Sequence, residues 1–239
     1  LLMCGVAGIG TAFVLMLYSR DLKHNVQRKD NVIDQKTKTK SSADSGVELL
    51  LSPPILMCLV FFTLLSLGST GIASFLIVAL GQHHGTAVET ATLILSTYLV
   101  LGAVGVLLGG FVADKTRKHN AVAALCFLST ALIIASVGFF NLGSFLLFIL
   151  LGVMGLMHGV IMPSRDMIVR SVTPEGSFGK VFGFVTSGFS IGGIVAPPIF
   201  GWILDQSEPS FLFFGIAGIM LCSMLTCLLY TSPSPRDGW

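Results

Sequence analysis

The sequence predicts an all-α fold, a polytopic membrane helix bundle with one partial and six full transmembrane helices. Apolar residues make up 53% of the 239 positions and charged residues only 11%. An ordinary soluble domain has roughly a quarter charged residues, so this chain has too little charge to cover a water-exposed surface. Long apolar runs and a one-sided distribution of basic residues complete the prediction.

The spans follow from the length of the apolar runs. About 20 mainly apolar residues cross the roughly 30 Å of hydrocarbon in a bilayer. Residues 1–17 form the partial span, and the full spans are Pro54–Leu80, Thr90–Val112, Ala121–Phe140, Ser144–Met162, Val181–Leu204 and Phe211–Tyr230. These runs are apolar on every side, which also fits buried helices of a large soluble protein. Seven runs joined mostly by short connections favour the membrane.

One long connection divides the chain. Residues 18–52 are polar, rich in Lys, Asp and Ser, and have no apolar period, which is typical of a flexible linker. We therefore expect residues 1–17 to be the last helix of an amino-terminal bundle that is missing here. Residues 53–230 are expected to form a six-helix carboxyl-terminal bundle. Residues 231–239 look like a non-native tail, so we expect a fragment.

The basic residues support this order of spans, because cytoplasmic connections collect Lys and Arg. If the linker is cytoplasmic, the connections at 114–120 and 165–180 and the tail are cytoplasmic too. Together these segments hold all 14 Lys and Arg residues, and the opposite connections hold none. We predict a multi-pass protein of the plasma (inner) membrane, with its linker and carboxyl terminus in the cytoplasm.

A first motif lies between the second and third full spans, where residues 109–118 read GGFVADKTRK. A glycine at 110 lets a neighbouring helix approach closely, and Asp114 can accept hydrogen bonds from the positive amino end of a helix. The basic cluster of Lys115, Arg117 and Lys118 suits anionic headgroups or carboxylates. A plain cytoplasmic loop is the alternative.

A second motif occupies the fifth full span. Gly188, Gly192 and Gly193 place small residues on a helix surface at packing distance. Pro197 and Pro198 lack amide donors and are expected to kink the helix. The alternative is a tightly packed but static helix.

A third motif carries charges at the inner end of the fourth full span. Arg165, Asp166 and Arg170 can form helix-end ion pairs with each other, or one arginine can meet Asp114. At a membrane edge such residues serve as anchors and local ion pairs more often than as solute ligands.

These motifs and the six-helix bundle behind a long basic linker resemble the major facilitator superfamily, whose members join two six-helix halves. The resemblance covers about residues 1–229 and implies helices six to twelve of a twelve-helix carrier. It implies that Gly110, Asp114 and the following basic residues form a cytoplasmic gating motif, although Arg117 stands where a second glycine is usual. Branches that export drugs or organic anions are also similar.

Few polar residues lie inside the spans. His158 is the ionisable one well inside a span, and because imidazole titrates near neutral pH it is a candidate proton relay. The alternative is a neutral imidazole bonded within the protein. Thr63, Ser66 and Thr70 share one helix face by their spacing and are candidates for a solute path. Their hydroxyls can equally bond within their own helix.

The resemblance implies secondary active transport of a small organic solute by alternating access, with a proton as candidate coupling ion. The expected partners are that solute, the lipid bilayer and the missing amino-terminal half, with no nucleic acid. No catalytic constellation, cofactor motif or metal-ligand spacing is present, and the five cysteines lie singly in apolar runs. The chain is therefore not expected to be an enzyme. A non-transporting membrane receptor or scaffold is the alternative.

Overall fold

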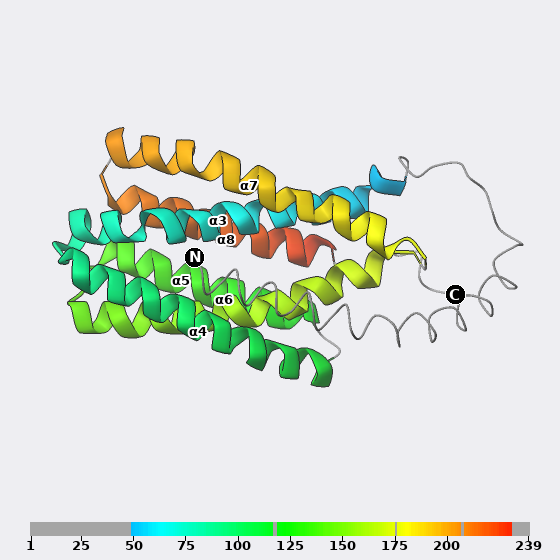
Figure 1. Ribbon diagram of the computed structural model, residues 1–239, viewed down its shortest axis with the longest axis horizontal. Helices are drawn as coiled ribbons and strands as arrows, with labels where there is room; N and C mark the ends of the chain where they lie inside the picture. Colours follow the sequence, from blue (N-terminus) through cyan, green and yellow to red (C-terminus); the bar gives the residue numbers. More distant parts are fainter. Residues whose placement is uncertain (1–48, 117–118, 175, 207, 231–239) are drawn as a thin grey trace, which may run out of the picture. The chain divides into compact units, whose positions relative to one another are not determined.

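Six long α-helices make up nearly all of the computed structural model, which describes residues 49–116, 119–174, 176–206 and 208–230 (Figure 1). The helices are α3 (Pro53–His84), α4 (Val88–Lys115), α5 (His119–Phe139), α6 (Ser144–Val172), α7 (Phe178–Gln206) and α8 (Ser210–Tyr230). Each contains a stretch long and apolar enough to cross a bilayer. The predicted all-α polytopic bundle is confirmed. The predicted partial span, the linker and the tail lie outside the described residues.

Local sequence explains where α3 begins and ends. Pro53 and Pro54 occupy its first turn, where the missing amide donors cost nothing and the fixed φ favours a helix. Gly85 follows its last residue with φ +63°, a left-handed conformation that glycine adopts without steric penalty. The chain then re-enters the bundle as α4 after a very short turn.

The carboxyl-terminal end of α6 differs from the prediction. The sequence placed a connection at residues 165–180, but α6 remains helical to Val172. Charged residues end a hydrophobic span without ending a helix, so α6 extends beyond the apolar run. Pro163 lies inside α6, as is tolerated in membrane helices whose neighbours satisfy the freed backbone groups.

The helices contact one another most extensively in three pairs, α4 with α6, α3 with α7, and α5 with α8. Contacts of α5 with α6 and of α3 with α8 join these pairs into one bundle, whereas α3 touches α4 and α6 much less. Figure 1 shows α7 running beside α3 and α4 running beside α6. The α3–α7 pair and the α4–α6 pair therefore contact each other less extensively than the two helices within each pair do.

Glycines account for the close approach within the α4–α6 pair. A Cβ atom added to Gly155 would overlap the carbonyl oxygen of Tyr98, and one added to Gly159 would overlap that of Gly102. From the other side, a Cβ at Gly105 would overlap the carbonyl oxygen of Leu156. Small residues let membrane helices pack backbone against backbone in this way.

Candidate solute cavity

A cavity of about 380 Å³ lies between α3 and the α4–α6 pair. Its volume falls within the range of about 300–1,000 Å³ that is usual for sites that bind small molecules. It is lined by Ser69, Thr70 and Ala73 of α3, by Tyr98, Leu99, Gly102 and Val106 of α4, and by Gly155, His158, Gly159 and Met162 of α6. A mainly apolar wall with a few polar groups is typical of a small-molecule site.

The polar groups of the cavity are three hydroxyls and one imidazole, from Ser69, Thr70, Tyr98 and His158. His158 and Tyr98 are both buried, with ring centroids 6.2 Å apart. In the described part of the chain, His158 Nδ1 has no hydrogen-bond partner. The candidate proton relay therefore lies at the cavity wall, with a ring nitrogen that no described side chain or carbonyl satisfies.

The three hydroxyl residues predicted to form a solute path on α3 differ in what they contact. Thr63 donates to the Leu59 carbonyl of its own helix at 2.9 Å, and Ser66 donates to the Phe189 carbonyl of α7 at 2.7 Å. Only Thr70 of the predicted trio lines the cavity, with Ser69 beside it. Helical spacing identified a common face but not the neighbour that covers it. Ser69 of the same helix and Tyr98 of α4 also line the cavity, although they were not among the predicted site residues, and the Ser69 hydroxyl donates to the Ser66 carbonyl at 3.1 Å.

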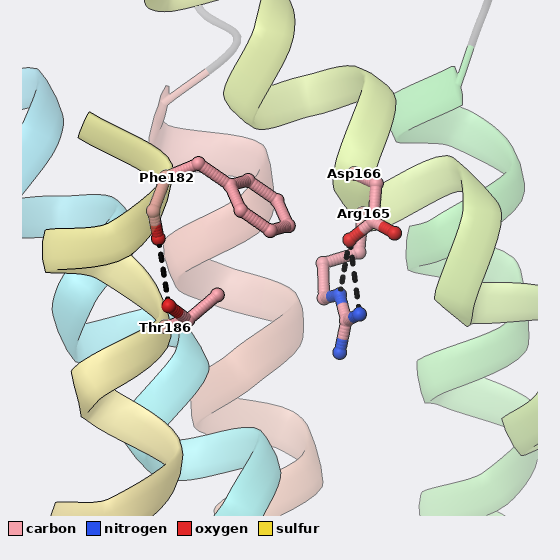
Figure 2. A network of polar contacts seen from close by, with 4 residues as sticks. All are labelled: Arg165, Asp166, Phe182 and Thr186. Atoms are coloured by element: carbon pink, nitrogen blue, oxygen red, sulfur yellow. Dashed lines mark hydrogen bonds and ion pairs between the residues drawn. The ribbon is translucent and has the colours of Figure 1, made fainter. Parts of the chain in front are cut away.

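In the charged cluster near the carboxyl-terminal end of α6, two residues adjacent in sequence form an ion pair (Figure 2). Arg165 Nε and Nη2 each lie 2.9 Å from Asp166 Oδ1. The guanidinium carbon also lies 4.7 Å from the ring centroid of Phe62 and 4.9 Å from that of Phe189. Arg165 is buried, Asp166 is partly exposed, and Arg170 is exposed. The predicted ion pair thus involves Arg165 and Asp166, and the structure gives Arg170 no described partner.

The predicted gating motif lies at the end of α4. Asp114 is exposed and makes no ion pair with a described residue, whereas Lys115 Nζ lies 4.2 Å from the centroid of the Phe111 ring. Arg117 and Lys118 lie outside the described residues. Nothing in the described part of the chain lies within 4 Å of a Cβ added to Gly110.

The close approach expected at Gly110 occurs one residue earlier. A Cβ added to Gly109 would lie 2.8 Å from both the Cα and the carbonyl oxygen of Val160 in α6. Because the two glycines are adjacent, the sequence alone did not indicate which of them points toward the neighbouring helix.

The glycines of α7 pack against α3. A Cβ added to Gly188 would lie 2.8 Å from the Leu59 carbonyl oxygen, and one added to Gly192 would lie 2.7 Å from Ser66 Cβ. Gly193 is less close, with Ser66 Oγ at 4.0 Å. Pro197 and Pro198 lie inside α7 and are exposed, and the helix continues through both.

Histidine, cysteine and carboxylate side chains do not converge in the described ranges. No group of three or more such residues there could hold a metal ion. The cavity lining holds hydroxyl, imidazole and apolar groups, which are able to form hydrogen bonds and van der Waals contacts.

Two comparisons with known proteins bear on the chain. The sequence profile of the Major Facilitator Superfamily matches residues 56–238. A curated protein, the hexuronate transporter of Bacillus subtilis (strain 168), is 26% identical over 167 residues. That alignment covers 64% of this chain and 38% of the relative, so the chain matches well under half of that protein's length.

Proposed function

The chain belongs to the Major Facilitator Superfamily, and on that premise we propose that it is the carboxyl-terminal part of a secondary active transporter for a small organic solute. The family and the similarity to a hexuronate transporter support solute transport rather than an enzymatic activity. Residues 53–230 then hold helices seven to twelve of the carrier.

The observation that carries the proposal is the cavity between α3 and the α4–α6 pair. It places Ser69, Thr70, Tyr98 and His158 around a space the size of a small solute. Transporters of this type bind solute near the middle of the membrane and rock two bundle halves around it. We propose that the amino-terminal half supplies the opposite wall of this space, and that alternating access exposes it to each side in turn.

Reconstitution of the complete protein in liposomes tests the proposal. Liposomes preloaded with unlabelled solute should take up the labelled solute by counterflow, first with glucuronate and glucose as trial solutes. Uptake should saturate and should require the protein. Specific binding without flux of any trial solute would instead indicate a receptor or scaffold and would contradict the proposal.

We further propose that proton coupling uses His158 and that the motif around Asp114 supports the conformational cycle. His158 faces the cavity, whereas Asp114 is exposed at the end of α4. A group that alternates between proton-bound and free states must contact the solute space, and a group that latches one conformation need not. The two residues therefore make different predictions.

Asp114→Asn in the complete protein should slow flux severalfold and leave the equilibrium affinity for solute within about threefold. The exposed carboxylate lies outside the cavity lining, so its loss leaves every group that lines the cavity in place. Flux and binding should be measured on the same preparation. Asp205→Asn, which removes an exposed carboxylate near the end of α7, is the matched control. A large loss of affinity with normal flux capacity would refute the assignment.

The topology proposal predicts which positions face the cytoplasm. Cysteines introduced at Lys36 and Lys118 should resist an impermeant thiol reagent in intact cells, and one introduced at Asn141 should react. The reason is that all basic residues fall in segments assigned to one side. All three should react after the cells are permeabilised, which controls for burial. Reaction at Lys36 or Lys118 in intact cells would overturn the topology.

A further inference from the structure

A buried positive charge lies about one helical turn beyond Met162, a residue of the cavity lining. Arg165 is 8% exposed, and of the residues that the structure describes it is the one Lys, Arg, Asp or Glu that is buried. We infer that the solute is a small organic anion, and that its carboxylate binds the guanidinium of Arg165 at the Met162 end of the cavity. This inference rests on the proposed transport function and specifies its substrate class.

The first argument is the balance of charge. No Asp, Glu, Lys or Arg lines the cavity. The counter-charge of Arg165 is Asp166, whose side chain is 46% exposed against 10% for that of Arg165. Water screens an exposed charge far more than a buried one. The negative charge of Asp166 therefore offsets only part of the positive potential that Arg165 produces inside the bundle. An anion in the cavity is therefore favoured and a cation is disfavoured.

The second argument is the unpartnered end of the guanidinium. Asp166 occupies the side formed by Nε and Nη2, while Nη1 is buried and has no hydrogen-bond partner in the described ranges. Figure 2 shows this third nitrogen pointing away from the Asp166 carboxylate. Guanidinium carries five N–H donors in a planar fork that matches a carboxylate. The Nη1 end therefore keeps donors for a second carboxylate.

The aromatic neighbours hold the guanidinium in place. Arg165 lies over the rings of Phe62 in α3 and Phe189 in α7, and these two rings are themselves 5.2 Å apart in an edge-to-face arrangement. Cation–π contacts of this kind attract the charge without using its N–H donors. The rings fix the position of the guanidinium and leave its hydrogen-bonding capacity for a ligand.

The third argument is the position of Arg165 relative to the cavity. His158, Met162 and Arg165 follow one another at spacings of four and three residues, so they lie along one face of α6. His158 and Met162 line the cavity, and Arg165 follows Met162 by about one turn on the same face, so its charge lies about one turn from the Met162 end of the cavity. The positive field therefore extends into the cavity. The hydroxyls of Thr70 and Tyr98 line the cavity, and the Ser69 hydroxyl, which donates to the Ser66 carbonyl at 3.1 Å, can accept a hydrogen bond from the uncharged part of the solute.

The experiment compares carboxylates with their uncharged counterparts on the complete protein in liposomes. Glucuronate, gluconate and benzoate are each tested for binding and flux against glucuronate methyl ester, glucose and benzamide. At least one carboxylate should bind at least tenfold more tightly than its counterpart. Arg165→Gln should weaken that binding about tenfold or more, as expected for loss of a charged hydrogen bond, and leave the uncharged counterpart unchanged.

Two variants complete the test. Arg170→Gln removes an exposed arginine of the same helix and should change affinity by less than about twofold. Arg165→Lys keeps the charge without the fork and should bind the carboxylate between wild type and Arg165→Gln. If Arg165→Gln fails to fold, the preference of the wild type for the charged member of each pair decides the question.

The outcomes separate the two proposals. If uncharged solutes are transported, and carboxylates are bound and transported equally well or less well, the anion assignment is overturned but the transport proposal is not. Carboxylate binding that Arg165→Gln does not alter would also overturn it. Absence of flux for every solute tested, including the uncharged ones, would instead count against the transport function itself.

Discussion

Gly159→Val should prevent the complete protein from folding into a transport-competent form. A Cβ at this position would overlap the carbonyl oxygen of Gly102 and lie 2.8 Å from the Val106 amide nitrogen and 2.9 Å from Gly105 Cα. All three are backbone atoms, so no rotamer change relieves the overlap and α4 must move away from α6. Overpacking of this kind costs about 1–3 kcal/mol and sometimes more. The same movement would distort the cavity that the pair lines.

The measurement is the yield of monodisperse protein, its thermal midpoint and its flux in liposomes. We expect yield and flux to fall at least tenfold. Gly183→Val is the matched control, because it makes the same substitution in α7 where nothing in the described ranges lies within 4 Å of the added Cβ. Similar behaviour of both variants would show that helix propensity, rather than backbone approach, explains the loss.

His158→Gln should abolish concentration of solute against its gradient while leaving solute exchange largely intact. His158 lines the cavity, and its Nδ1 has no partner in the described part of the chain. A permanent charge inside a span costs at least about 2.5 kcal/mol on insertion scales, so we expect the imidazole to rest neutral and to accept a proton transiently. Glutamine keeps a donor and an acceptor but does not titrate.

The test compares gradient-driven uptake with counterflow at several pH values. Exchange should remain within a fewfold of wild type, and the dependence of uptake on an imposed proton gradient should disappear. His83→Gln is the control, because it removes an imidazole at the end of α3 that does not line the cavity. Unchanged pH dependence of gradient-driven uptake in His158→Gln would make His158 a structural residue.

The sequence predicted the spans well because the bilayer sets their length. Five of the six described helices begin and end within three or four residues of the predicted limits, since hydrophobicity changes sharply at the headgroups. The sixth, α6, extends ten residues beyond the predicted Met162. Hydropathy reports the thickness of hydrocarbon and not the continuity of backbone hydrogen bonds, so it could not locate this end.

The candidate site was predicted only in part, because it depends on which helices meet. Periodicity placed Thr63, Ser66 and Thr70 on one face of α3, but the first two hydroxyls bond to carbonyl groups and only Thr70 lines the cavity. Likewise the sequence could not tell Gly109 from Gly110. His158 stood out because an ionisable residue inside a span is rare, a signal that needs no knowledge of its neighbours.

Solute protection of a single cysteine tests the central claim, that this cavity holds the transported solute. With the native cysteines replaced, Thr70→Cys in the complete protein should react with a thiol reagent, and saturating transported solute should slow that reaction at least fivefold. Glu89→Cys, at an exposed position in the first turn of α4, should react at the same rate with and without solute. Equal reactivity of Thr70→Cys in both conditions, in a variant that still transports, would contradict the claim.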